Sequence, residues 1–206
     1  MALAGMGPEA ARRACNALLS AGARSLVSWG CAGGLDATIR TGTVIVAAHV
    51  AGSAGIMWSP ARQWSDRVAR ALGDAVPIVR GTLASPDAVV HTPIEKRVLA
   101  QRGMIAVDME SAAVAAAADG AGVPWIVVRA VADTAAMAVP ASVTAAVDTA
   151  GQLSITRLTR ALLRRPEEIL LLPPLARGFR GALRALRVVA NRAGDALLDP
   201  REAYTA

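Results

Sequence analysis

Short runs of apolar residues alternate along the chain with longer stretches in which apolar residues recur every three or four positions. The short runs predict β-strands, and the periodic stretches predict α-helices. Strands are expected at residues 25–29, 43–48, 78–84, 88–90, 105–107 and 125–131, and helices at residues 9–21, 65–72, 93–101, 110–120 and 142–164. Residues 50–64 fit neither pattern and are expected to form a loop. Strands that alternate with helices in this way predict a layered α/β domain.

The strand expected at residues 125–131 is apolar at almost every position, which is typical of a strand that is buried on both faces of a sheet. Asp133 follows closely after this strand. Ligands of α/β proteins bind at the carboxyl ends of strands, and a carboxyl group there can act as a general acid when its surroundings raise its pKa. A plainer alternative is that Asp133 only caps the segment that follows.

Two further segments carry residues suited to chemistry. Residues 30–34 (GCAGG) follow the strand expected at 25–29, and glycines at such a turn let backbone N–H groups approach an anion or a sugar. Residues 107–111 (VDMES) lie where a strand passes into a helix, and a carboxylate there can accept hydrogen bonds from both hydroxyls of a ribose. A tight turn and acidic capping of the helix are the structural alternatives.

Composition narrows the class of protein. The chain has 206 residues, which suits one domain with a substantial core. Two histidines and two cysteines do not form a cluster with metal-ligand spacing, so neither a metal nor another cofactor is expected. No apolar run reaches the roughly 18 residues that a membrane span needs, and residues 1–8 lack the pattern of a signal peptide. These absences favour a cytoplasmic protein.

Positive charge is concentrated near the C-terminus. Nine arginines and two glutamates lie between residues 157 and 192, a local balance of +7 against +6 for the whole chain. A helix is expected there with an apolar face (Leu175, Phe179, Leu183, Leu186) and a basic face (Arg180, Arg184, Arg187). Such a helix either lies on an anionic membrane surface or packs on the domain with its arginines in solvent. Nucleic acid is not expected as a partner, because this stretch offers a single aromatic side chain for stacking on bases.

Three segments taken in order, GCAGGL (residues 30–35), VDMES (107–111) and RAVADTA (129–135), resemble the signature motifs of the nucleoside phosphorylase superfamily. This superfamily includes purine and uridine phosphorylases and the methylthioadenosine/S-adenosylhomocysteine nucleosidases. The resemblance implies a three-layer α/β/α fold around a central mixed sheet, a homo-oligomeric assembly, and cleavage of the bond between a base and ribose. The nucleophile would be water or inorganic phosphate. The similar region ends at about residue 165, which divides the chain into a domain (1–165) and a basic amphipathic extension (166–206).

The resemblance also implies a role for each matching residue. Asp133 would be catalytic and protonate N7 of adenine, a base that leaves badly as an anion. Glu110 would hold the ribose hydroxyls, and Met109 would pack on the sugar. The remaining assignments are Val89 and Val90 for the base pocket, and Gly30, Ala32 and Gly33 for a loop near the sugar and the phosphate or water.

Within the superfamily, the alanine-rich helix after DMES and the arginine- and leucine-rich stretch at 162–192 look like those of the hopanoid-associated phosphorylases. That subfamily is thought to remove adenine from adenosylhopane. The resemblance therefore implies a substrate with a lipid on its 5′ carbon, and an enzyme that touches the inner face of the membrane through its basic helix. Deletion of residues 175–192 is then expected to reduce membrane association more than activity.

One departure concerns the start of the chain. Members of the superfamily usually begin with a further strand and loop, whereas the motifs place residue 1 near their second or third strand. The fold is therefore expected to lack the first strand, which would expose an edge of the sheet. Two alternatives stay open. One is a methylthioadenosine/S-adenosylhomocysteine nucleosidase, and the other is a shortened nucleoside-binding protein without turnover.

Overall fold

The computed structural model describes residues 5–147, 154–198 and 200 of the chain. Its centre is an eight-stranded sheet in the order β4-β3-β6-β7-β1-β8-β2-β5. The strands are β1 (Leu26–Gly34), β2 (Val44–Val46), β3 (His49–Gly52), β4 (Met57–Trp58), β5 (Ile78–Val79), β6 (Thr82–Ser85), β7 (Met104–Val107) and β8 (Trp125–Asp133). Strand β1 runs parallel to β8 and antiparallel to β7. The sheet is therefore mixed, as expected.

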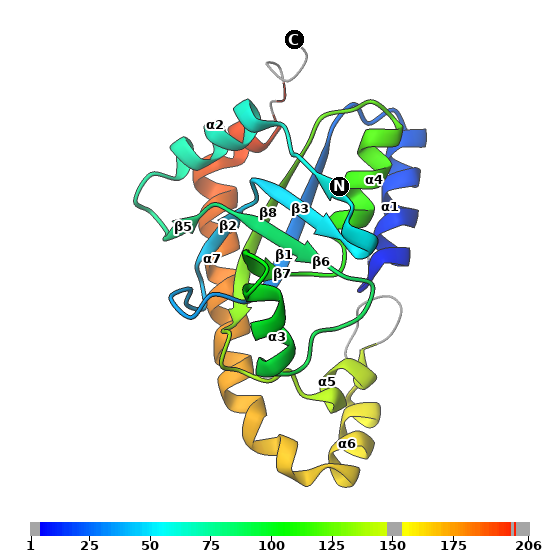
Figure 1. Cartoon of the computed structure of the whole chain (residues 1–206), viewed down its shortest axis with the longest axis vertical. Coiled ribbons are helices and arrows are strands. Elements are labelled where there is room, and N and C mark those ends of the chain that lie inside the picture. Colours follow the sequence, from blue (N-terminus) through cyan, green and yellow to red (C-terminus); the bar gives the residue numbers. More distant parts are fainter. Residues whose placement is uncertain (1–4, 148–153, 199, 201–206) are drawn as a thin grey trace.

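Helices cover both faces of this sheet (Figure 1). They are α1 (Pro8–Ser20), α2 (Arg62–Leu72), α3 (Pro93–Ala100), α4 (Ser111–Gly120), α5 (Ala141–Ala146), α6 (Ile155–Arg164) and α7 (Leu172–Leu198), with short 3-10 helices η1 (Ser53–Gly55) and η2 (Pro166–Leu171). Helices α1 and α4 pack into one apolar core, and α2 and α7 pack into another on the opposite face. The predicted three-layer α/β/α arrangement is confirmed.

Strand β8 is an interior strand of the sheet, and all nine of its residues are buried. It pairs with β1 on one side and with β2 on the other. Its alternating side chains therefore enter the two apolar cores, which explains why the sequence is apolar at nearly every position. The predicted strand at 125–131 is confirmed and extends to Asp133.

Several other predicted elements are wrong in extent. Residues 30–34 continue β1 rather than forming a loop, because their backbone pairs with β8. Residues 88–90 form no strand, and the region expected as a loop holds β3, β4 and the start of α2. Strand β3 exists because β6 supplies a parallel partner, which local pattern does not reveal. The single helix expected at 142–164 is divided into α5 and α6, and residues 148–153 lie outside the described residues.

Helix α7 is built into the domain. Its buried residues Ala182, Ala185, Leu186, Val189 and Ala193 belong to the core that covers β8 and β2. Of the predicted apolar face, Leu186 is buried, whereas Phe179 and Leu183 stay 48% and 46% exposed. Deletion of residues 175–192 would therefore remove core side chains and destabilise the domain, so it does not isolate membrane association. The division of the chain at residue 165 stays a prediction.

Small residues set how closely α7 approaches the sheet. A Cβ added at Gly178 would collide with the backbone carbonyl oxygen of Ala132, one residue before the end of β8. The helix therefore supports the strand end that carries Asp133. Within the described ranges, none of the helices combines the length and the apolar character that crossing a membrane requires.

Candidate active site

The ends of three neighbouring strands meet at Gly33 of β1. Gly33 pairs with Val107, the last residue of β7, and with Asp133, the last residue of β8. A Cβ at Gly33 would lie 3.0 Å from Asp133 Oδ2 and 3.2 Å from Val107 Cγ1. Glycine thus leaves the space that the Asp133 carboxyl group occupies. The same pairing brings residues 108–110, which follow β7, to this end of the sheet.

Asp133 is only 7% exposed, and its carboxyl group forms an ion pair with Lys96 of α3. Burial raises the pKa of Asp133 above its ordinary value, and the neighbouring ammonium group opposes that rise without cancelling it. A carboxyl group at the end of a buried strand that holds its proton more firmly than usual is suited to general acid catalysis.

Helix α3 places Lys96 through a well-defined start. Thr92 Oγ1 accepts a hydrogen bond from Glu95 N at 3.2 Å, and Glu95 Oε2 accepts one from Thr92 N at 2.8 Å. This reciprocal capping, together with Pro93 in the first turn, fixes where the helix begins. Lys96 then lies on the inner side of the helix and is fully buried.

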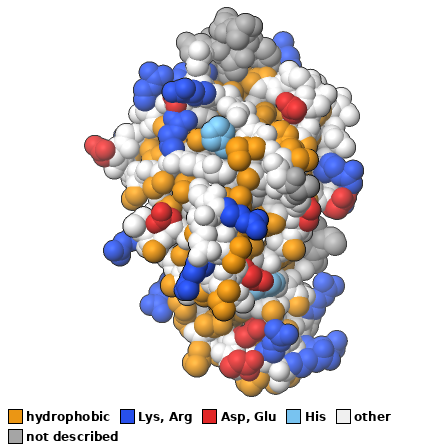
Figure 2. All heavy atoms as spheres, viewed as in Figure 1, with side chains coloured by type: hydrophobic (Ala, Val, Ile, Leu, Met, Phe, Trp, Pro, Cys, Tyr) orange, Lys and Arg blue, Asp and Glu red, His pale blue; other side chains and the backbone are white. Residues whose placement is uncertain are grey.

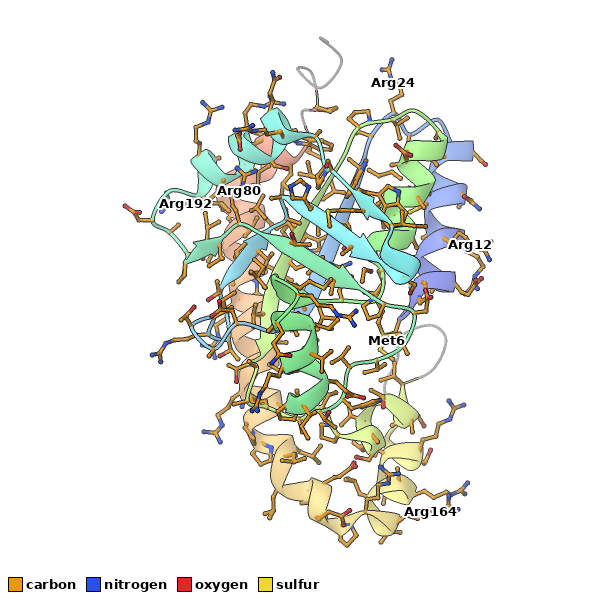
Figure 3. All side chains as sticks on the ribbon, in the orientation of Figure 1. Met6, Arg12, Arg24, Arg80, Arg164 and Arg192 are labelled. Atoms are coloured by element: carbon orange, nitrogen blue, oxygen red, sulfur yellow. The ribbon has the colours of Figure 1, made fainter. Side chains whose placement is uncertain are left out.

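Glu110 lies between the N-terminal segment and the sheet. Its Oε1 accepts a hydrogen bond from Gly7 N at 2.8 Å, and its Oε2 lies 3.6 Å from Arg129 Nη1. Met109 lies beside the same segment, since a Cβ at Gly7 would be 3.8 Å from Met109 Cε. Met6, labelled in Figure 3, comes just before this contact at the start of α1. The carboxylate is thus oriented by one backbone donor and one cation.

Arg129, the cation beside Glu110, belongs to a buried network of polar side chains. Arg129 of β8 places Nε 2.7 Å from Asp108 Oδ2 and donates from Nη2 to Ser28 Oγ at 2.7 Å. Asp108 also accepts hydrogen bonds from the N–H and the hydroxyl of Ser111, which begins α4. Asp108 therefore caps a helix and neutralises an arginine, so the capping alternative describes this residue. Glu110 does not cap α4 with its side chain.

Gly30 leaves room for the Arg129 side chain of that network. A Cβ at Gly30 would collide with Arg129 Nη1, so a glycine is needed here for the guanidinium group. The loop expected for Gly30, Ala32 and Gly33 is a strand, and Ala32 is buried in the core beside α1 and α4. Of the three, Gly33 lies directly against Asp133. A role of these residues towards phosphate or sugar stays a prediction.

Val89 and Val90 lie in the irregular segment after β6. Val90 packs against the small cluster that contains Val107. The next residue, His91, accepts a hydrogen bond at its carbonyl from Val139 N at 2.8 Å, which ties this segment to the one that follows β8. The valines are therefore held near the Asp133 end of the sheet, where a base-pocket role stays a prediction.

The charged groups of this region, together with burial, shift the pKa of a nearby thiol, that of Cys31. Burial raises the pKa of Cys31 in β1 to about 11, with Arg129 lowering it and Asp133 and Glu110 raising it further. The thiol therefore stays protonated near neutral pH. Among the residues that the structure describes, no three His, Cys, Asp or Glu side chains are grouped so that they could hold a metal ion.

Comparison with known proteins assigns this arrangement to a family. Residues 1–164 match the Phosphorylase superfamily. The chain belongs to that superfamily. No curated protein matches the chain in sequence. The expectation of a phosphorylase or nucleosidase relationship is thereby confirmed at the level of the superfamily.

Solved structures of the phosphorylase superfamily share the fold. A 5′-methylthioadenosine/S-adenosylhomocysteine nucleosidase from Colwellia psychrerythraea 34H, solved with adenine, is 24% identical with a TM-score of 0.59, over 65% of this chain and 64% of that protein. The Campylobacter jejuni nucleosidase of the same name has 15% identity and a TM-score of 0.64, over 92% and 78%. Futalosine hydrolase of Helicobacter pylori has 16% identity and a TM-score of 0.63, over 90% and 76%. This chain thus spans less than two thirds of the Colwellia protein.

Sequence reasoning missed two charged residues of the site, Arg129, which pairs with Asp108, and Lys96. Lys96 was expected only as part of a helix at 93–101. A signal was present, because Lys96 shares a helical face with Leu99 and Ala100, which pack against the cluster around Val107. A lysine on an inward face indicates a buried partner, since lysine is almost never fully buried unless it is paired.

Proposed function

We propose that this protein cleaves the N-glycosidic bond of a 5′-substituted adenosine and releases adenine. The observation that carries the proposal is the buried Asp133 at the end of β8, whose pKa burial raises. Membership of the phosphorylase superfamily supports it. The fold is also shared with a nucleosidase that was solved with adenine bound.

In the proposed reaction, Asp133 gives its proton to N7 of the base. As the bond between C1′ and N9 breaks, its electron pair moves to the base, which leaves as neutral adenine instead of an anion. The ribose becomes cationic at C1′ and is trapped by water or inorganic phosphate. General acid catalysis of this kind is worth on the order of 10²–10⁴-fold in rate.

Glu110 is proposed to bind the ribose. A carboxylate has about four sites that accept hydrogen bonds, and Gly7 N takes one of them. The remaining sites can accept hydrogen bonds from the 2′ and 3′ hydroxyls. Met109, beside Gly7, would cover the face of the sugar.

The nucleophile separates two versions of the reaction. Arg129, buried beside Glu110, already pairs with Asp108 and Ser28, so it is not assigned to phosphate. Adenine release that requires inorganic phosphate would identify a phosphorylase. Equal release in phosphate-free buffer would identify a hydrolase.

The finer proposal is that the 5′ substituent is a lipid, as in adenosylhopane. Two features support it: the resemblance of the helix after DMES and of residues 162–192 to those of hopanoid-associated phosphorylases, and the surface formed by η2 and the first half of α7. Arginines lie there beside exposed apolar residues such as Leu170, which is 80% exposed. Figure 2 shows blue, red and orange side chains side by side at this end of the molecule. We propose that this end rests on an anionic bilayer from which the substrate is taken.

The main alternative is a nucleosidase for 5′-methylthioadenosine or S-adenosylhomocysteine, the activities named for several proteins of the same fold. The two are separated by kcat/KM for 5′-methylthioadenosine and for an adenosine with a long 5′-alkyl chain presented in vesicles. A preference for the alkyl substrate supports the lipid proposal, and a preference for the thioether overturns it.

The test of the reaction itself is adenine release by the wild-type chain and by Asp133→Asn. The amide keeps the shape of the carboxyl group but cannot deliver the proton, so release should fall by about 10²-fold or more, whereas nucleoside binding measured by calorimetry should persist. Asp119→Asn, at an exposed carboxylate near the far end of α4, is the matched control. Unchanged release by Asp133→Asn would overturn the acid role, and a wild-type chain that binds nucleoside without turnover would favour the non-catalytic alternative.

A further inference from the structure

Lys96 satisfies every donor of its ammonium group inside the protein. It is 0% exposed, contacts Asp133 Oδ2, and donates to the carbonyl oxygens of Thr134 at 2.7 Å and Met137 at 2.9 Å. An ammonium group has three N–H donors, so none is left over. Burying a lysine is unfavourable because its charge loses water, and only close partners for the ammonium group offset this loss. A fully buried lysine at this position therefore needs an explanation.

Asp133 becomes negatively charged during the proposed reaction, and the ammonium group of Lys96 can stabilise that charge. A protonated carboxyl group interacts weakly with an ammonium group, whereas a carboxylate interacts strongly. As the proton moves from Asp133 to the base, the attraction to Lys96 grows. An interaction that is stronger in the transition state than in the ground state lowers the barrier.

The geometry also separates the two oxygens of the carboxyl group. Lys96 contacts Oδ2, and both oxygens lie beside Gly33, where an added Cβ would be 3.0 Å from Oδ2 and 3.5 Å from Oδ1. Oδ1 has no hydrogen-bond partner among the described residues and is free to carry the transferred proton. A contact that pins one oxygen fixes the direction in which the other one faces.

We propose that Lys96 is a positioning residue for the acid step, holding Asp133 by Oδ2 and stabilising the carboxylate that remains after the proton has passed to the base. This inference rests on the proposed function, because it assumes that Asp133 is the general acid. The alternative role is structural, in which Lys96 only ties α3 to residues 134–137 through the two carbonyl oxygens.

The other titratable groups near Asp133 do not stabilise its carboxylate in the way that Lys96 does. Cys31 of β1 is neutral over the working range of pH, because its pKa is raised to about 11. Arg129 is already paired with Asp108. Lys96 of α3 is the cation whose pairing with Asp133 lowers the pKa of that carboxyl group.

The test compares Lys96→Met with wild type across pH. Loss of the ammonium group should raise the pKa of Asp133, so the alkaline limb of kcat/KM should move to higher pH by roughly one to three pH units. Plateau kcat should fall by at least about tenfold, because the carboxyl group becomes a weaker acid. Arg97→Met, which removes the same charge from an exposed position on the same helix, should change neither quantity.

A second substrate separates the acid step from general damage. A riboside with the same 5′ group and a 4-nitrophenolate leaving group needs no protonation, so Lys96→Met should cleave it at nearly the wild-type rate. Lys96→Arg should restore much of the adenine release, since a cation is kept. Equal losses on both substrates, with an unmoved pH limb, would overturn the proposal and leave the structural role.

If Lys96→Met is inactive, the pKa of Asp133 can still be measured directly, without any turnover. The ¹³C signal of the Asp133 carboxyl carbon, assigned with Asp133→Asn, can be titrated in the wild-type chain and in folded Lys96→Met. A higher titration midpoint in the variant supports the proposal, and an unchanged midpoint refutes it. If wild type releases no adenine, the proposed function fails on that result, whereas this titration still decides whether Lys96 controls Asp133.

Discussion

At the scale of single residues, Glu110 offers the sharpest test of substrate recognition. Glu110→Gln keeps the size of the side chain and an oxygen for Gly7 N, but removes the negative charge. Hydrogen bonds to charged groups contribute about 1.5–3 kcal/mol, so kcat/KM should fall by about tenfold to hundredfold. The control is Glu9→Gln on the exposed face of α1.

The origin of that loss can be checked with a 2′-deoxy substrate. If Glu110 accepts a hydrogen bond from the 2′ hydroxyl, removing that hydroxyl should already cost the wild-type enzyme much of the interaction. The added effect of Glu110→Gln on the deoxy substrate should then be smaller than on the ribose substrate. Strictly additive losses would show that Glu110 does not contact this hydroxyl.

Cys31 provides an independent check of the burial of β1 and of the charges beside it. Its pKa is raised to about 11, so the reactive thiolate is scarce at pH 8. We expect alkylation of Cys31 by iodoacetamide at pH 8 to be slow in the folded protein, to accelerate as the pH approaches 11, and to be fast after unfolding in urea. Rapid modification of the folded protein at pH 8, followed by peptide mapping, would contradict the arrangement around β1.

Residues differ in how far sequence alone predicts their place. Asp133 and Glu110 were recognised because each carboxylate follows an apolar strand in an otherwise weakly charged region. Lys96 was missed because a lysine in a helix is usually exposed, although it shares a helical face with the apolar Leu99 and Ala100. Gly30 was expected near a ligand, whereas it makes room for Arg129, a contact between strands that are about a hundred residues apart in sequence.

At the scale of elements, the packing of α7 on β8 is tested by two glycines of one helix. Gly178→Ala would place a methyl group on the carbonyl of Ala132, whereas a Cβ at Gly181 meets nothing within 4 Å. Forcing atoms into a packed contact costs typically about 1–3 kcal/mol. Alanine at an open helical site gains roughly 0.5–1 kcal/mol. Urea unfolding should therefore show Gly178→Ala less stable than wild type and Gly181→Ala slightly more stable.

The two variants also connect packing to activity. Because Ala132 precedes Asp133, a shift of β8 caused by Gly178→Ala should lower kcat, whereas Gly181→Ala should leave it unchanged. Equal stability of the two variants would show that α7 does not approach the strand closely.

Elements were predictable where the local pattern and the tertiary environment agree. Strand β8 and helices α1 and α3 fall within a few residues of the expected bounds, since an apolar run or a capping signal marks each of them. Strands β3 and β4 were not expected, because β3 depends on pairing with β6 much later in the sequence, and β4 is a two-residue edge strand that depends on β3. The extension of β1 was hidden by glycines, which usually indicate turns.

At the scale of the whole molecule, the concentration of arginines between residues 157 and 192 predicts which side of the protein would contact an anionic membrane. The arginines of α7 lie on its exposed side, and Arg192 is labelled towards one end of the helix in Figure 3. Arg164, also labelled, projects from the end of α6 away from the sheet. Homo-oligomer formation, expected from the resemblance, stays a prediction that light scattering can check.

The membrane proposal is tested by reversing charge without touching the core. Arg180, Arg184 and Arg187 are exposed on α7, whereas the helix binds the domain through its buried alanine and valine residues. Each arginine near an anionic bilayer contributes about 1 kcal/mol, so replacing all three with glutamate should weaken vesicle binding by at least about 10²-fold. The matched control reverses Arg13, Arg62 and Arg102, which are exposed elsewhere.

Sedimentation with phosphatidylserine vesicles at low salt measures this binding, and neutral phosphatidylcholine vesicles show whether it depends on charge. Both triple variants should remain folded and should cleave a water-soluble 5′-substituted adenosine at the wild-type rate, because all six arginines are exposed and none of them pairs with Asp133, Asp108 or Glu110. A lipid substrate embedded in anionic vesicles should be cleaved more slowly by the α7 variant alone. Equal sedimentation of both variants, or wild-type binding that persists on neutral vesicles, would mean that the arginines of α7 face water and serve only to keep the packed helix soluble.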